Sequence, residues 1–219
     1  MRNEMSFLER AARGLVHVTP RPKALQGGVA GECIIFVVDH SGSMGIACGQ
    51  VDRLRAAQDA MIALLNTRRE YQADDAVLVI AFNDEAEIVL PSTSCRSNRG
   101  RIDSAIRSIG VAGGTDLKKP LELVLTLLKD ERNVHIVMLS DGQDAEDPTT
   151  AARRLKDRGA VIETIGVGND PSEVDEQQLK AVASVLGGKV LYRFISDADE
   201  MTGYFRTEIA NRLVKRSES

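Results

Sequence analysis

The feature that most constrains the fold is an alternation of short apolar runs with longer amphipathic segments. The runs at 33–38 and 76–82 are apolar throughout, as strands are when both faces of their sheet are covered. Further strands are expected at 86–90, 134–139, 160–165 and 190–194, and helices at 53–70, 101–109, 117–129, 148–158, 175–186 and 199–214. This alternation predicts an α/β fold: a doubly wound, mostly parallel six-stranded sheet, Rossmann-like, with helices on both faces.

The third expected strand should differ from the others in direction. A short turn around Asn83 and Asp84 is all that separates 76–82 from 86–90. Such a short connection joins antiparallel strands in a hairpin, whereas parallel strands need a long crossover. We therefore expect the strand at 86–90 to be antiparallel and to lie at an edge of the sheet.

The chain length of 219 residues suits one domain with a short extension. We assign 31–215 to the domain and 1–30 to the extension, because the TPRP stretch at 19–22 interrupts regular structure. Ser6 followed by Glu9 forms a capping box before an apolar stripe, which predicts a short amphipathic helix within the extension.

Composition excludes several classes of protein. The net charge of -4 argues against a nucleic-acid binder, which usually needs a basic surface. No run approaches the roughly 18 apolar residues of a membrane span. The N-terminus lacks the apolar core of a secretory signal, so a cytoplasmic location is expected, although an exported protein without its leader would look the same. Cys33, Cys48 and Cys95 match no zinc spacing and are expected to be reduced thiols.

Three polar, glycine-containing joints stand out along the chain. DHSGSMG at 39–45 follows the first expected strand, SDGQD at 140–144 follows the fourth, and GGTD at 113–116 precedes the helix that leads to the fourth strand. Ligands of open α/β sheets bind at the carboxyl ends of strands, where the strand order reverses. If the first and fourth strands are neighbours, all three joints meet at that point.

The joints supply a set of oxygen donors: Asp39, Ser41, Ser43, Thr115 and Asp141. Two carboxylates and three hydroxyls suit a hard cation such as Mg²⁺, Mn²⁺ or Ca²⁺ and suit zinc poorly. Ser41 and Ser43 are two residues apart, so in an extended loop their side chains can point the same way. The sequence therefore predicts a divalent-cation site.

This donor set resembles the metal-ion-dependent adhesion site (MIDAS) of the von Willebrand factor type A domain. The family pattern is Asp-x-Ser-x-Ser after the first strand, a Thr in a middle loop and an Asp after the fourth strand, and this chain matches all five positions. The resemblance covers about residues 30–214. It implies that Ser41, Ser43 and, with a partner bound, Thr115 contact the metal directly, whereas Asp39 and Asp141 act largely through water and hydrogen bonds.

The resemblance also implies a function. Mainly neutral direct ligands leave the metal electrophilic, and a Glu or Asp of a protein partner is expected to fill its open position. The function expected is a metal-dependent protein-protein interaction module without enzymatic activity.

The alternative is an enzyme, a Mg²⁺-dependent phosphohydrolase with Asp39 as nucleophile and Asp141 holding the metal. Haloacid-dehalogenase-like phosphatases carry a second Asp where Ser41 stands, and no lysine lies in the three joints. A serine hydrolase lacks its G-x-S-x-G elbow here, and a dinucleotide binder lacks G-x-G-x-x-G.

Simpler roles are possible for single residues. Each aspartate of the donor set could alone cap a helix, but together with three hydroxyls the pair favours a cation site. Asp144, Glu146 and Asp147 follow the fourth strand and are expected to be solvated loop charges. His40 is expected to be structural or a bystander.

Overall fold

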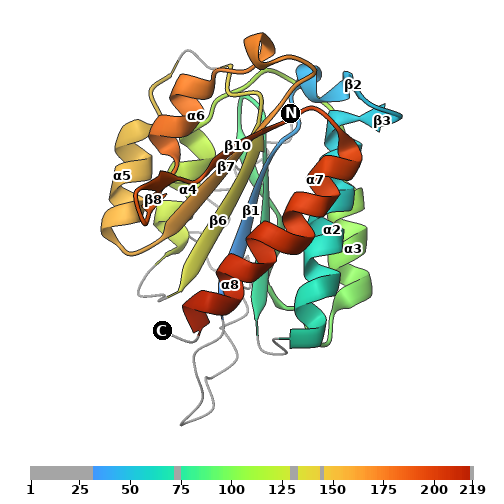
Figure 1. The fold of residues 1–219 in the computed structure, drawn as a ribbon, viewed down its shortest axis with the longest axis vertical. Coiled ribbons are helices and arrows are strands. Elements are labelled where there is room, and N and C mark those ends of the chain that lie inside the picture. The colour runs from blue at the N-terminus through green and yellow to red at the C-terminus, as the bar shows by residue number, and fades with distance from the viewer. Residues whose placement is uncertain (1–31, 72–74, 129–132, 144–145, 218–219) are drawn as a thin grey trace, which may run out of the picture.

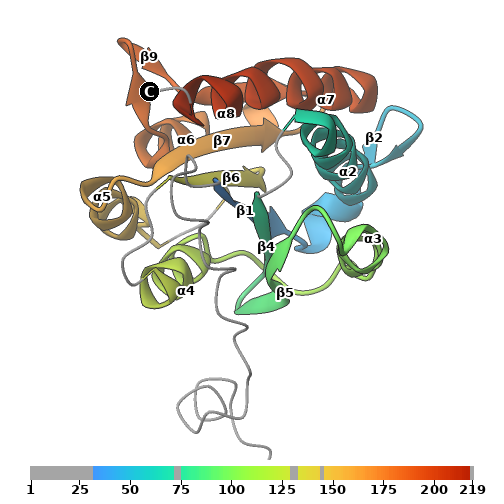
Figure 2. The same ribbon diagram turned by 90° about the horizontal axis from the view of Figure 1, so that it is seen from below.

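The computed structural model describes residues 32–71, 75–128, 133–143 and 146–217. Its main feature is a six-stranded sheet in the order β10-β7-β6-β1-β4-β5, with helices on both faces (Figures 1 and 2). The strands are β1 (Cys33–Asp39), β4 (Ala76–Phe82), β5 (Ala86–Ser94), β6 (Val134–Ser140), β7 (Val161–Val167) and β10 (Tyr192–Ile195). The predicted fold class is confirmed.

The central strand β1 pairs in parallel with β4 on one side and with β6 on the other. The first and fourth predicted strands are therefore neighbours. The chain leaves β1 toward β4 and later returns to β6 on the opposite side, so the strand order reverses beside the end of β1. β5 pairs antiparallel with β4 and forms one edge of the sheet, as predicted.

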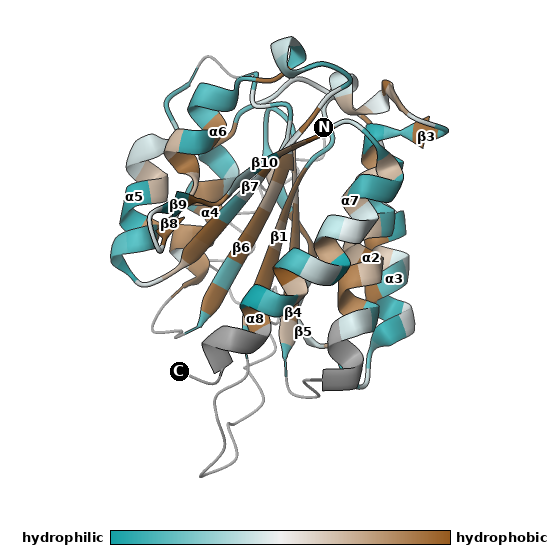
Figure 3. Cartoon of the chain, in the orientation of Figure 1, coloured by the Kyte–Doolittle hydropathy of each residue, from teal (hydrophilic) through white to brown (hydrophobic). Residues whose placement is uncertain are grey.

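Helices cover the two faces in separate groups (Figure 2). One face carries α2 (Arg53–Tyr71), α3 (Arg99–Arg107), α7 (Ala198–Tyr204), the π-helical turn η3 (Phe205–Ile209) and α8 (Ala210–Ser217). The other face carries α4 (Lys118–Leu127), α5 (Thr149–Asp157) and α6 (Glu176–Val182). Each helix turns its apolar side to the sheet and its polar side outward (Figure 3).

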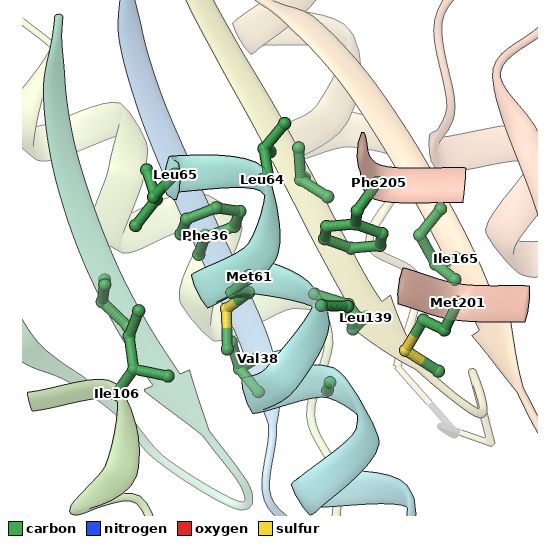
Figure 4. Close-up of a cluster of buried hydrophobic side chains, with 14 of the residues drawn as sticks. Phe36, Val38, Met61, Leu64, Leu65, Ile106, Leu139, Ile165, Met201 and Phe205 are labelled. Carbon is green, nitrogen blue, oxygen red and sulfur yellow. The ribbon is translucent and has the colours of Figure 1, made fainter. Parts of the chain in front are cut away.

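Alternation along β1 explains why this strand is apolar throughout. Phe36 and Val38 point into the core beneath α2, where they meet Met61, Leu64 and other buried side chains (Figure 4). The intervening side chains of β1 point into the second core, beneath α4 to α6. The same alternation runs through β4 and β6, so the centre of the sheet is buried on both faces.

The helix predicted at 175–186 is too long at its C-terminal end. α6 ends at Val182, and β8 (Val185–Leu186) then pairs antiparallel with β9 (Lys189–Val190). Gly187 and Gly188 have φ values of 55° and 77°, and two consecutive positive φ angles favour a tight hairpin turn. A glycine pair after an amphipathic segment also suits the end of a helix, which is why the expected helix reaches 186. Because of the hairpin, the last strand begins only at Tyr192.

Several short elements were not predicted. The hairpin of β2 (Ala47–Cys48) and β3 (Val51–Asp52) follows the 3-10 turn η1 (Gly42–Gly45), and a second 3-10 turn, η2 (Pro171–Glu173), follows β7. The predicted N-terminal helix lies outside the described residues. None of the helices in the described ranges is both long and apolar enough to cross a membrane.

Candidate metal centre

Asp39 ends β1 and is fully buried, with none of its surface exposed. Its Oδ1 accepts a hydrogen bond from Ser41 N at 2.8 Å, and its Oδ2 accepts one from Ser140 Oγ at 2.6 Å. Ser140 Oγ in turn accepts from Gly142 N at 2.9 Å. The Asp39 carboxylate therefore fixes its own loop and joins it to the end of β6.

Burial has an electrostatic cost at this carboxylate. It raises the pKa of Asp39 to about 6, although the hydrogen bonds from Ser140 and Ser41 act in the opposite direction. A buried carboxylate is penalised in its charged form unless a cation or enough donors compensate it. A cation held near Asp39 would supply such compensation.

The two serines of the first joint converge. Ser41 Oγ and Ser43 Oγ lie 3.1 Å apart. Ser41 is almost fully buried, and its carbonyl accepts from Met44 N at 3.0 Å, which starts the turn η1. The buried side chain of Met44 anchors that turn in the core. The local fold therefore brings the two hydroxyl oxygens to one point beside Asp39.

Backbone hydrogen bonds hold the loop that carries Thr115 against the first joint. Gly42 N donates to Gly113 O at 3.1 Å, and Ala112 N donates to His40 O at 2.8 Å. The ring of His40 adds a contact of 2.7 Å between its Nδ1 and the carbonyl oxygen of Gly110. Thr115 follows Gly113 and Gly114 in the same loop and is half-buried. His40 thus ties the two loops together.

Gly113 is required by the geometry of this junction. Its φ is 75°, and a Cβ atom there would lie 2.7 Å from Asn83 Nδ2 and 2.9 Å from Asp84 Oδ2. Asp84 Oδ2 also accepts a hydrogen bond from Gly114 N at 2.7 Å. The hairpin turn between β4 and β5 therefore packs under the Thr115 loop, where only glycine fits.

Asp141 follows β6 and is also buried. Its Oδ1 accepts from Gln143 N at 3.3 Å, and its carbonyl accepts from Asp175 N at 2.9 Å. The side chain of Asp175, and not that of Asp141, caps α6. Pro148, and not Asp141, precedes the first residue of α5. Helix capping therefore does not explain Asp141.

The acidic residues that follow Asp141 have other roles. Glu146 and Asp147 are exposed. Asp147 Oδ1 accepts from Thr149 N at 2.9 Å and from Thr149 Oγ1 at 2.6 Å, at the start of α5, and these bonds lower the pKa of its carboxyl group. Asp144 lies outside the described residues.

Arg53 is a residue of this region that the sequence reasoning missed. It begins α2, yet only 2% of it is exposed. Its Nη1 lies 4.0 Å from Asp141 Oδ2, and its Nη2 donates to Glu173 Oε2. One signal was present: Arg53 is three and four residues before the buried Ala56 and Ala57, so it falls on the inward face of the helix.

The donors of this region fit a hard divalent cation. Two buried carboxylates lie on loops that are hydrogen-bonded together, and two serine hydroxyls converge beside Asp39. Across the part of the chain that the structure describes, no three His, Cys, Asp or Glu side chains gather as a metal-binding group. A cation here would therefore depend on hydroxyl oxygens, which suit Mg²⁺, Mn²⁺ or Ca²⁺.

Comparison with known proteins bears on the family and the fold of this chain. A family model described as the von Willebrand factor type A domain matches residues 34–143, half of the chain. An uncharacterized protein of Synechocystis sp. is 29% identical over 180 residues, which are 79% of this chain and 40% of that protein. This chain thus spans well under two thirds of that relative's length.

Solved structures share the fold. The conserved hypothetical protein BatB from Bacteroides thetaiotaomicron superposes with a TM-score of 0.68 at 21% identity, over 84% of this chain and all of that chain. Proximal thread matrix protein 1 from the mussel byssus, solved with a zinc-occupied MIDAS motif, gives a TM-score of 0.67 at 20% identity, over 85% of this chain and 47% of that one. Together with the match of the family model, they lead to one conclusion: this chain belongs to the von Willebrand factor type A domain family.

Proposed function

We propose that this protein binds one divalent cation, Mg²⁺ with Mn²⁺ or Ca²⁺ as alternatives, and uses it to bind an acidic side chain of a protein partner. The observation that carries the proposal is the buried Asp39 carboxylate beside two converging hydroxyls, Ser41 Oγ and Ser43 Oγ. The zinc-occupied MIDAS motif of the mussel protein supports it as an analogy of fold.

The proposed cation ligands differ in charge. Ser41, Ser43 and Thr115 offer neutral oxygens, whereas Asp39 and Asp141 supply the negative charge from buried positions. When bound, the cation supplies Lewis acidity that an outside carboxylate can satisfy. The loops themselves orient the hydroxyls, because Asp39 and the Gly42–Gly113 backbone bond fix their positions.

Affinity capture tests the proposal. The immobilised protein is exposed to an extract of its source in Mg²⁺, washed, and eluted with EDTA, in parallel with Asp39→Asn and with Asp157→Asn, an exposed aspartate in α5. A partner that elutes with EDTA from wild type and Asp157→Asn, but is absent from Asp39→Asn, supports the proposal. Equal capture in EDTA, or by Asp39→Asn, contradicts it.

We assign no catalytic step to this site. A phosphohydrolase would need a free carboxylate oxygen on Asp39 to attack phosphorus. Both oxygens of Asp39 already accept hydrogen bonds, from Ser41 N and Ser140 Oγ, and the side chain is inaccessible. Hydrolysis of p-nitrophenyl phosphate in Mg²⁺ that disappears in Asp39→Asn would instead support the enzymatic alternative.

A further inference from the structure

A buried cationic side chain adjoins the candidate metal centre. Arg53 is 2% exposed, and its Nη1 lies 4.0 Å from Asp141 Oδ2, which is too far for a hydrogen bond. Its Nε is buried and has no hydrogen-bond partner among the described residues. The positive charge of Arg53 therefore lies close to Asp141, but no hydrogen bond joins the two side chains.

The other carboxylate near Arg53 is only partly buried. Arg53 Nη2 donates to Glu173 Oε2, and the side chain of Glu173 is 42% exposed. Glu173 Oε2 also accepts from Asn169 N at 3.0 Å, and the carbonyl of Glu173 accepts from Gln143 Nε2 at 2.7 Å. Water screens the exposed part of Glu173. Glu173 therefore neutralises the charge of Arg53 less completely than a buried carboxylate would.

The position of Arg53 matters for any cation held by Asp39 and Asp141. Two like charges repel more strongly in a buried site than in water, because the effective dielectric constant is lower. The positive charge of Arg53 acts against the cation, whereas it attracts the carboxylate of an incoming partner. One residue therefore influences the two binding steps in opposite directions.

We propose that Arg53 sets the charge of the metal centre, so that the site holds its cation weakly alone and more strongly once an acidic ligand adds its negative charge. This inference rests on the proposed function. It assigns Arg53 an electrostatic role beside Asp141, and it makes cation binding and partner binding mutually dependent.

Direct titration with Mn²⁺ tests the inference, with free Mn²⁺ measured by electron paramagnetic resonance. Arg53→Gln should bind Mn²⁺ at least tenfold more tightly than wild type, because the variant removes a unit positive charge that repels the divalent cation across a few Å of partly buried protein. Arg53→Lys keeps the charge and should stay within about twofold of wild type. Arg55→Gln, on the exposed face of the same helix turn, is the matched control and should change little.

The sign of the change separates this role from a structural one. If Arg53 only supported the loop of Asp141, Arg53→Gln would bind Mn²⁺ more weakly, and that result, or an unchanged affinity, overturns the inference. Should Arg53→Gln fail to fold, the double variant Arg53→Gln with Glu173→Gln removes the ion pair without leaving Glu173 unpaired. Its Mn²⁺ affinity should lie between those expected for wild type and Arg53→Gln, and an affinity at or below wild type overturns the inference.

The same titration keeps the two proposals apart. If wild type binds Mn²⁺ and Asp39→Asn does not, the metal centre stands, and only the variants of Arg53 decide the inference. If wild type binds no Mn²⁺, the proposed function fails and the inference fails with it.

Discussion

Single hydroxyl groups should decide whether the cation binds. Ser41→Ala removes one of the two converging oxygens while leaving the backbone bond from Ser41 N to Asp39 in place. A cation at about 100 times its dissociation constant stabilises a folded protein by about 2.7 kcal/mol. We expect Ser41→Ala to lose most of this Mg²⁺-dependent stabilisation, measured as the difference in free energy of unfolding with Mg²⁺ and with EDTA.

The control for that variant is Ser104→Ala, which alters an exposed serine on α3. It should keep the full Mg²⁺ effect. If Ser41→Ala retains the same Mg²⁺-dependent stabilisation as Ser104→Ala, the hydroxyl of Ser41 is not a ligand.

Glycine at position 113 should be essential for the loop that carries Thr115. In Gly113→Ala the new Cβ would crowd Asn83 and Asp84 at a φ of 75°. We expect destabilisation of roughly 1–3 kcal/mol and weaker Mn²⁺ binding, measured by urea unfolding and by titration. Gly110→Ala in the same loop meets no atom within 4 Å and should change neither quantity; equal effects of the two variants would contradict the role given to Gly113.

The candidate site shows what residue types can and cannot predict. The five candidate oxygen donors could be named from the sequence, because the Asp-x-Ser-x-Ser pattern is local, Asp141 follows a strand, and Thr115 lies in a glycine-containing loop before a helix. Their binding of a cation stays a prediction. Arg53 and Ser140 could not be named, since their importance comes from contacts with Asp141 and Asp39, which lie far away along the chain. Helical spacing places Arg53 on the inward face of its helix, but neither residue carries a pattern that identifies its distant partner.

At the scale of elements, the C-terminal helix is fixed to the sheet by a buried polar cluster. Glu163 of β7 is fully buried, accepts from Tyr204 Oη at 2.7 Å and from Arg212 Nε at 3.1 Å, and lies 3.3 Å from His135 Nε2. Burial alone would raise the pKa of Glu163, but the hydrogen bonds and charges of His135 and Arg212 outweigh it and lower that pKa below its usual 4.5.

This shift predicts how the stability of the fold depends on pH. A carboxyl group whose pKa is lower in the folded state stabilises the fold above its unfolded pKa, here 4.5, and that contribution is lost as the pH falls through the folded pKa. Glu163→Gln should therefore reduce the free energy of unfolding at pH 7 by roughly 2–4 kcal/mol. The difference from wild type should shrink at pH values below 4.5, as measured by urea unfolding at each pH.

Glu208→Gln gives the comparison for this prediction. Glu208 also pairs with Arg212, at 3.4 Å, but its side chain is 57% exposed, so its loss should change stability little at any pH. A deficit in Glu163→Gln that does not diminish in acid would show that packing, rather than charge, accounts for the effect.

Element boundaries were predictable where a pattern was long, and less so where a turn decided them. β1, β4 and β6 were predicted to within one residue because both faces of each are buried. The end of α6 was misplaced, since Gly187 and Gly188 can end a helix or turn a hairpin equally well. The pairing of β8 with β9 makes the two glycines a hairpin turn instead of a helix end. That pairing is not a property of the glycines alone.

For the molecule as a whole, the fold should not depend on the cation. The two apolar cores, one on each face of the sheet, are built mostly from side chains outside the three loops of the metal centre. This differs from small zinc domains, in which metal binding supplies the folding energy.

EDTA should therefore leave the far-ultraviolet circular dichroism spectrum unchanged. The melting temperature should fall by about 5–10 °C from its value in saturating Mg²⁺, since about 2.7 kcal/mol corresponds to that range for a chain of this size. Loss of the spectrum in EDTA would mean that the cation holds the fold together. An unchanged melting temperature would mean that Mg²⁺ does not bind the folded protein, which would contradict the proposed function for this cation.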